Sequence, residues 1–177
     1  MKSLEDQMSL YAAYHQDARN KATHFVGVPA IVLSLFIPLS WLRLEVGGTT
    51  LTAAMGFATV VLAYYFLLNL RLAAAMTLVT ALLVYAGELI GREPMGVSLV
   101  WFAALFGGGW VLQLVGHAFE GRKPALVDNL FQIFVAPIFL CAEVFFALGY
   151  RPDLREAVQR RAQELRTNPG FHGPTPA

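Results

Sequence analysis

Long apolar runs separated by short charged segments dominate the sequence. Each run is about as long as the roughly 20-residue helix that crosses a hydrocarbon core of about 30 Å. Because charged side chains resist burial in lipid, the separating segments should lie at the membrane surfaces. The pattern predicts an all-α polytopic membrane helix bundle with about five apolar spans, approximately Phe25–Leu42, Leu51–Leu70, Leu72–Ile90, Val97–Gly116 and Ala125–Gly149.

Both ends of the chain are polar. The segment from Met1 to Thr23 lacks the apolar core and cleavage site of a secretory signal, so we expect the first run to insert and remain. After Tyr150 a helical stripe of apolar residues predicts an amphipathic helix at the membrane interface, rather than a dedicated partner-binding helix: Leu154, Val158, Ala162 and Leu165. We assign residues 1–150 to a membrane-embedded domain with an N-terminal polar helix, and residues 151–177 to the amphipathic helix and a flexible tail.

Composition supports the membrane class and excludes other classes. The 177 residues are 56% hydrophobic and 14% charged, and the mean hydropathy is +0.54, which is too apolar for a soluble domain. A net charge of +1 with scattered Lys and Arg offers no surface for nucleic acid. The single cysteine, Cys141, allows no intramolecular disulfide. High Ala, Gly and Arg content with short loops favours a bacterial inner membrane, or the endoplasmic reticulum if the source is eukaryotic.

Three histidines are predicted to share one membrane interface. His15 and His24 precede the first apolar run, and His117 follows the fourth. Because four crossings return the chain to its starting side, the count places all three histidines there. The same count puts Glu120 and Asp128 beside them. This convergence is the clearest indication of function in the sequence.

The fifth run leaves two topologies open. If it crosses fully, His172 lies opposite the other histidines, and we expect Glu143 to extend its carboxylate to that far interface. If the run, which contains Pro137, dips into the membrane and returns, both chain ends lie with the histidines. The distribution of Lys and Arg then favours the cytoplasm as their side.

Helical spacing pairs some of these residues directly. Asn20 and His24 are four apart and His117 and Glu120 are three apart, so each pair shares one helical face. Neutral imidazoles with a carboxylate suit Fe(II) or Zn(II), whereas magnesium and calcium prefer oxygen ligands. Each histidine also has an ordinary interpretation as a half-buried, hydrogen-bonded side chain, and Glu120 as a solvated loop charge.

His15 and His24 do not share a helical face. Nine residues correspond to about 180° around a regular helix, so the two rings reach one ion only if the helix breaks between them. A turn near Asp17–Asn20 would suffice; two separate ions are the alternative.

Two segments resemble the membrane-embedded 2-hydroxy fatty acid dioxygenases of fatty-acid α-oxidation, the family that acts in phytosphingosine breakdown. The resemblance covers roughly Leu10 to Glu143. Its residues are Tyr14-His15, Asn20, His24 and Pro29 in the first segment, and Gln113-Leu114-Val115-Gly116-His117-Ala118-Phe119-Glu120-Gly121-Arg122-Lys123-Pro124-Ala125-Leu126 with Asp128-Asn129 in the second.

The resemblance implies an Fe(II)-dependent dioxygenase that uses O2 to shorten a 2-hydroxy fatty acid by one carbon. It implies His15, His24 and His117 as the iron ligands, with Asn20, Glu120 and Asp128 as candidate catalytic residues. The acyl chain of such a substrate partitions into the bilayer, and its head group stays at the interface where the histidines are predicted. There an iron ion could chelate the carboxylate and 2-hydroxyl together.

Two other classes stay open. A non-enzymatic small membrane transporter or scaffold would use the polar cluster to line a path or to stabilise packing. A lipid hydroxylase or desaturase would also be a membrane enzyme, but such enzymes usually need more histidines to hold two irons.

Overall fold

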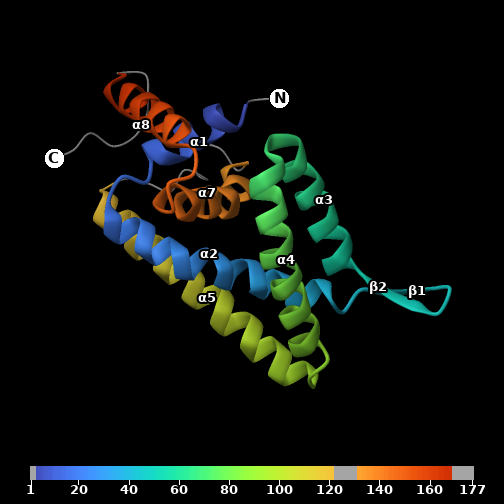
Figure 1. The fold of residues 1–177 in the computed structure, drawn as a ribbon. Helices are drawn as coiled ribbons and strands as arrows, with labels where there is room; N and C mark the ends of the chain where they lie inside the picture. Colours follow the sequence, from blue (N-terminus) through green and yellow to red (C-terminus); the bar gives the residue numbers. More distant parts are fainter. Residues whose placement is uncertain (1–2, 122–130, 169–177) are drawn as a thin grey trace. The chain divides into compact units, whose positions relative to one another are not determined.

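The computed structural model describes residues 3–121 and 131–168, which are mostly helical (Figure 1). The chain divides into two compact units, one of Met1–Phe25 with Leu112–Ala177 and one of Val26–Val111. The elements in chain order are α1 (Leu4–Ala13), α2 (Ala18–Leu39), β1 (Arg43–Val46), β2 (Thr49–Thr52), α3 (Ala53–Leu68), α4 (Leu70–Gly91), α5 (Met95–Glu120), α7 (Gln132–Ala147) and α8 (Pro152–Thr167).

Three helices are long and apolar enough to cross a membrane: α2 and α4 with 22 residues each, and α5 with 26. The apolar helices α3 and α7 have 16 residues each. At 1.5 Å per residue these two extend about 24 Å, which is less than the hydrocarbon core. The helices fit the predicted all-α class, and the three long apolar ones are compatible with a membrane protein. Five full spans are not confirmed, because α3 and α7 are shorter.

A β-hairpin occupies the separator between the first two predicted runs, where we expected only a connection. β1 and β2 pair antiparallel with Val46 opposite Thr49. Gly47 and Gly48 between them have φ values of 57° and 81°, a left-handed conformation that glycine adopts without steric cost and that a two-residue hairpin turn requires. The all-α description needs this exception.

Asn69 separates α3 from α4, as expected for a tight hairpin between the second and third runs. Its extended backbone ends α3, and its side-chain oxygen accepts hydrogen bonds from the Arg71 and Leu72 amides at the start of α4. One residue therefore both stops one helix and caps the next.

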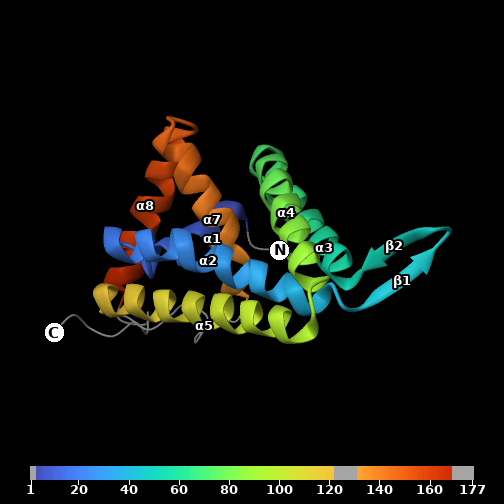
Figure 2. The same cartoon turned by 90° about the horizontal axis from the view of Figure 1, so that it is seen from below.

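Glycines let the apolar helices approach closely within the unit of Val26–Val111. A Cβ added at Gly87 of α4 would lie 2.7 Å from the Phe36 Cβ of α2, and one at Gly109 of α5 would lie 2.6 Å from Ile31 Cγ1. Figure 2 shows α2 and α5 running side by side. Small residues at such contacts are typical of helix packing in membranes.

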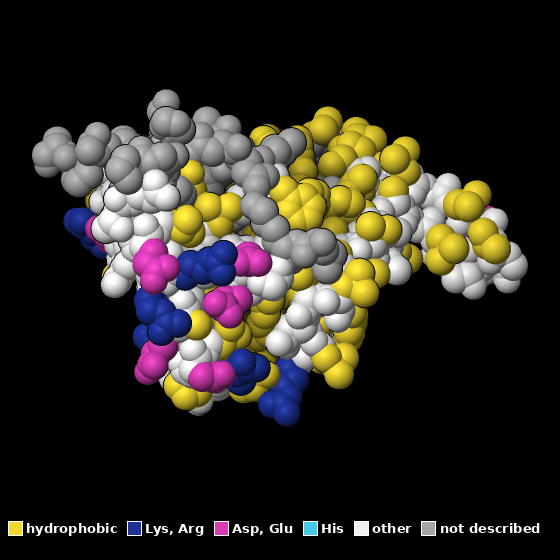
Figure 3. Space-filling model, turned by 90° about the horizontal axis from the view of Figure 1, so that it is seen from above, with side chains coloured by type: hydrophobic (Ala, Val, Ile, Leu, Met, Phe, Trp, Pro, Cys, Tyr) yellow, Lys and Arg dark blue, Asp and Glu magenta, His cyan; other side chains and the backbone are white. Residues whose placement is uncertain are grey.

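The other unit is built around α1. Tyr11 of α1 packs on Phe139 of α7, with ring centroids 4.6 Å apart. The α8 residues Val158 and Ala162 are fully buried, and α8 packs against α1. The apolar stripe that we expected at the membrane interface is therefore covered by the protein itself. The opposite side of α8 is polar, and Figure 3 shows basic and acidic side chains next to one another.

Glu143 of α7 forms an ion pair with Lys21 of α2, 2.9 Å from Nζ to Oε2. Lys21 is one helical turn before His24, so the expectation that Glu143 reaches the far interface is wrong. Because both α7 and α8 pack on α1, the arrangement fits the alternative in which the fifth run returns to the side of the histidines.

Candidate metal centre

A four-residue link, Tyr14–Asp17, separates α1 from α2 and supplies the predicted helix break. Asp17 Oδ1 accepts a hydrogen bond of 2.7 Å from the Arg19 amide in the first turn of α2. Hydrogen bonds from Arg19 lower the pKa of Asp17 to about 2, so an anion lies at the positive end of the helix. The break overlaps the expected segment at Asp17 and lets the chain fold back.

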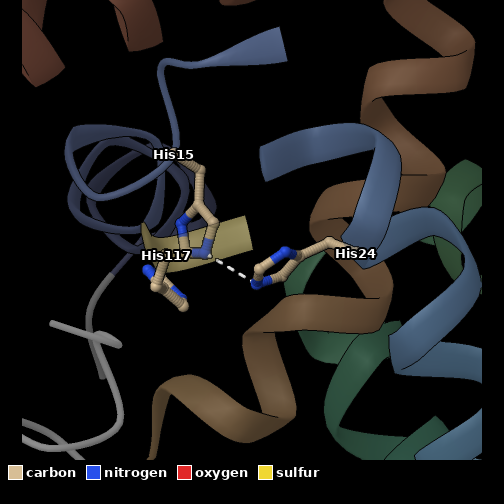
Figure 4. Close-up of side chains that lie close together, drawn as sticks. All are labelled: His15, His24 and His117. Carbon is tan, nitrogen blue, oxygen red and sulfur yellow. Dashed lines mark hydrogen bonds between the residues drawn. The ribbon is translucent and has the colours of Figure 1, made fainter. Parts of the chain in front are cut away.

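The link brings His15, His24 and His117 together, and we call these three residues the histidine cluster (Figure 4). One ligand nitrogen from each ring lies within 4.8 Å of the others. Their exposed fractions are 2%, 2% and 6%. The histidines come from the link, the start of α2 and the end of α5, so the convergence expected from the sequence is present in the fold.

Hydrogen bonds to the backbone determine the tautomers of two rings. His15 Nδ1 lies 2.7 Å from the Tyr11 carbonyl oxygen, and His24 Nδ1 lies 2.9 Å from the Asn20 carbonyl oxygen. A carbonyl can only accept, so each Nδ1 carries the proton. In the neutral rings both Nε2 atoms are then unprotonated.

The two Nε2 atoms are nevertheless only 3.2 Å apart, the contact dashed in Figure 4. Two lone pairs at this distance repel unless a cation lies between them. Two nitrogens that each lie about 2.1 Å from one ion are about 3.0 Å apart at a right angle and about 3.4 Å apart at a tetrahedral angle. The observed distance falls between these values. Nδ1 of His117 is buried and has no hydrogen-bond partner in the part of the chain that the structure describes.

His15 is the most constrained of the three. The Tyr11 ring stacks on it with centroids 3.9 Å apart and an interplanar angle of 4°. Burial lowers the pKa of His15 well below its ordinary value, and the positive charges that His24, His117 and Lys21 can carry add to this effect. His15 is therefore neutral at pH 7, the form that binds metals.

Glu120 is fully engaged in hydrogen bonds. Oε2 accepts from the Gln16 and Asp17 amides at 2.9 Å and 2.7 Å and from Asn20 Nδ2 at 3.2 Å, while Oε1 accepts from Arg166 Nη1 at 2.8 Å. The carboxylate side chain is 2% exposed. These bonds hold the link in place, and Asn20 connects Glu120 to His24 through its carbonyl.

Comparison with known proteins shows the family to which this chain belongs. The family model described as 2-hydroxy-palmitic acid dioxygenase Mpo1-like matches residues 1–148. The chain is 33% identical over 163 residues to the 2-hydroxy-palmitic acid dioxygenase MPO1 of Saccharomyces cerevisiae, covering 88% of this chain and 87% of the yeast protein. This chain belongs to the Mpo1-like family. No solved structure matches it.

Gly116 allows the histidines of this Mpo1-like chain to meet. A Cβ at position 116 would overlap Thr23 Oγ1 and Asn20 Oδ1, and it would lie 3.2 Å from His24 Nδ1. Any side chain here would push the end of α5 away from the start of α2. His117 follows directly and depends on that close approach.

Two further polar residues of the Mpo1-like chain were missed as site residues. Gln113 lies four residues before His117 on the same face of α5, and its buried Nε2 has no hydrogen-bond partner within residues 3–121 and 131–168. The four-residue spacing could have indicated it. Arg166 of α8 binds Glu120 from a helix outside the matched residues, and no sequence pattern connects the two.

Some predicted positions lie outside the described residues. These are Asp128 and Asn129 of the second motif, and His172.

Proposed function

We propose that the protein is an Fe(II)-dependent dioxygenase that uses O2 to shorten 2-hydroxy fatty acids by one carbon. The observation that carries the proposal is the pair of unprotonated Nε2 atoms held 3.2 Å apart in a buried cluster of three histidines. Membership of a family whose yeast relative is named a 2-hydroxy-palmitic acid dioxygenase supplies the reaction class.

The donor set fits a divalent transition metal. Neutral imidazoles suit iron, zinc, copper and nickel, and the oxygenase name of the relative favours iron among them. When bound by His15, His24 and His117, Fe(II) would supply the electron transfer that makes O2 reactive toward an organic acid. Three protein ligands would leave coordination positions free for the substrate and O2.

The neighbouring residues hold and orient the ligands. Asn20 fixes the His24 ring through its carbonyl, and Glu120 fixes the link that carries His15. Because four donors surround the Glu120 carboxylate, we assign it a positioning role. We retain Asp128 as a proposed catalytic residue on the basis of its place in the motif.

Gln113 is the residue we assign to the substrate head group. Its Nε2 is buried one helical turn from His117 and has no hydrogen-bond partner among the described residues, on the side of the cluster toward the middle of α5. A buried donor without a partner is costly unless a ligand satisfies it. A substrate carboxylate would accept this hydrogen bond while the acyl chain extends along the apolar helices. The composition favours a bacterial inner membrane as the host.

The reaction balances with O2 as the only oxidant. A 2-hydroxy acid and one O2 give the acid one carbon shorter, CO2 and water, with cleavage of the C1–C2 bond. The 2-hydroxyl matters because it makes C2 already partly oxidised and because, with the carboxylate, it could bind an iron ion held by the histidine cluster through a five-membered ring. Unsubstituted and 3-hydroxy acids cannot form that ring.

The proposal is tested with purified protein that is first loaded with Fe(II) in the absence of O2 and is then assayed in buffer that contains O2. We expect 2-hydroxy-palmitic acid to stimulate O2 uptake and to yield the acid one carbon shorter, detected by chromatography. Palmitic acid and 3-hydroxy-palmitic acid should give neither. Their chains are equally long and partition similarly, so a difference must arise at the head group. Equal turnover of palmitic acid would favour a hydroxylase, and no O2 uptake with any acid would favour a non-enzymatic protein.

The ligand assignment has its own test. His15→Ala, His24→Ala and His117→Ala should each abolish turnover and lower the iron content while the protein remains inserted in the membrane. His172→Ala, outside both motifs, is the matched control and should retain both. Near-normal turnover in any two of the three cluster variants would contradict a three-histidine site.

A further inference from the structure

The C-terminal helix α8 contacts the link beside the histidine cluster through Gln159, whose Oε1 accepts a hydrogen bond of 3.3 Å from Gln16 Nε2, and it contacts Glu120 through Arg166. Arg166 Nη1 donates to Glu120 Oε1 at 2.8 Å and to the carbonyl of Ala13 at 3.1 Å. Ala13 is the last residue of α1, and Glu120 is the last residue of α5. Arg166 therefore joins the end of α1, where the link that carries His15 begins, to the end of α5.

The Glu120 carboxylate needs this cation. Its side chain is 2% exposed, and among the residues that the structure describes its other donors are two backbone amides and the Asn20 amide, all neutral. A buried carboxylate that loses its charged partner is strongly destabilised. It would move toward water and release the amides of Gln16 and Asp17, the two residues that follow His15 in the link.

The docking of α8 does not depend on Arg166 alone. The apolar stripe of α8 is buried through Leu154, Val158 and Ala162. Arg161 forms a second ion pair with Asp6 of α1, at 2.8 Å. That pair lies in the same α1–α8 contact but does not touch Glu120. A change at Arg161 therefore affects the docking of α8 and leaves the hydrogen bonds of Glu120 in place.

We propose that α8 is a positioning element of the metal centre and that Arg166 is its positioning residue, although α8 carries no ligand to the metal. Metal binding by the histidine cluster and the α8 contact with Glu120 then strengthen each other, because linkage between two equilibria is reciprocal. The proposal rests on the metal site of the proposed function. It goes beyond the family match, which ends at residue 148.

The test measures Co(II) binding to the full-length protein by its visible absorption spectrum, without turnover. Arg166→Gln should weaken Co(II) affinity about 10- to 100-fold, the usual effect of losing a group that supports metal ligands. Arg161→Gln, the matched control on α8, should change it less than about twofold. Arg166→Lys should restore part of the affinity, because it returns the charge without the forked geometry.

A double-variant cycle tests the route through Glu120. Glu120→Gln alone should weaken Co(II) binding about as much as Arg166→Gln, and the double variant should be no weaker than either. In the reciprocal direction, Co(II) should slow tryptic cleavage within α8 of the unmodified protein and should not do so in Arg166→Gln.

The outcomes separate this inference from the proposed function. If the unmodified protein binds no Co(II), the metal site itself is wrong. If it binds Co(II) and Arg166→Gln binds equally well with unchanged helix content, α8 has no positioning role. Should Arg166→Gln not fold, Arg166→Lys decides: affinity reduced between about threefold and thirtyfold supports the role, and unchanged affinity overturns it.

Discussion

The protonation state of His15 follows from where its ring lies. The ring is buried between Tyr11 and the other two histidines, and burial lowers its pKa below the ordinary histidine value. In the folded protein a proton would have to enter an enclosed site that already repels positive charge. In the unfolded chain the same ring takes up a proton as pH falls through about 6.5.

We therefore predict that acid destabilises the metal-free protein through His15. The contribution is fully present above about pH 6.5 and is lost as pH falls toward the lowered pKa, because only the unfolded chain binds the proton. The free energy of unfolding should fall by about 1.4 kcal/mol per pH unit for this proton. Denaturant unfolding in detergent between about pH 8 and pH 5 measures the slope. His15→Gln should reduce it, and an unchanged slope would contradict the assignment.

Substitution of Gln113 should lower activity without lowering folding stability. Gln113→Met keeps the length of the side chain and removes a buried donor that has no partner, so folding stability should stay the same or rise by about 1 kcal/mol. Loss of the hydrogen bond to the substrate should lower kcat/KM about tenfold with unchanged iron content. Thermal unfolding and steady-state kinetics together check this; reduced stability with normal kcat/KM would show that Gln113 is only a packing residue.

At the scale of elements, the sequence indicated that a single-ion site needs a break between His15 and His24, because nine residues place them on opposite helical faces, and it left two separate ions as the alternative. It did not predict the β-hairpin, since a short polar segment with two glycines also reads as a plain connection. The sequence predicted the apolar stripe of α8, but it did not predict that this stripe packs against α1. An apolar stripe has the same period whether it faces lipid or α1, and only the tertiary contact distinguishes them.

The contact between α2 and α5 gives a prediction at this scale. Gly116→Ala should lower iron content and turnover severely, because the added Cβ overlaps Asn20 and Thr23. Gly108→Ala is the matched control on the same helix, since nothing lies within 4 Å of its added Cβ. It should retain iron and gain up to about 1 kcal/mol in helix propensity. Metal analysis and thermal unfolding of both variants test the contact; equal iron contents would contradict it.

At the scale of the whole molecule, hydropathy predicted an all-α bundle of apolar helices and the convergence of the histidines, but the five full spans that it predicted are not confirmed. Runs of about 20 apolar residues were identified correctly, yet α3 and α7 have only 16 helical residues each. The apolar run that contains α7 includes buried residues such as Ile138 and Phe139 that pack within the protein. Hydropathy does not distinguish residues buried in protein from residues buried in lipid.

The packing of α8 on α1 predicts that these two helices lie on the same side of the membrane. In a Cys141→Ala background, single cysteines at Arg19 and Arg155 should react with an impermeant reagent from the same side of intact vesicles. A cysteine at Thr49 in the β-hairpin, beyond the span of α2, should react from the other side. All three positions are exposed. Labelling of Arg19 and Arg155 from opposite sides would show that the fifth run crosses fully.

The link between α1 and α2 also bears on how an ion enters. All three rings of the cluster are buried, so a hydrated ion cannot reach them while the link stays closed. The link is four residues long and is held by hydrogen bonds to one carboxylate. Opening it would swing His15 away without disturbing the apolar helices. We therefore expect an ion to enter and to leave more slowly than at an open site, at rates that depend on how often this short segment opens.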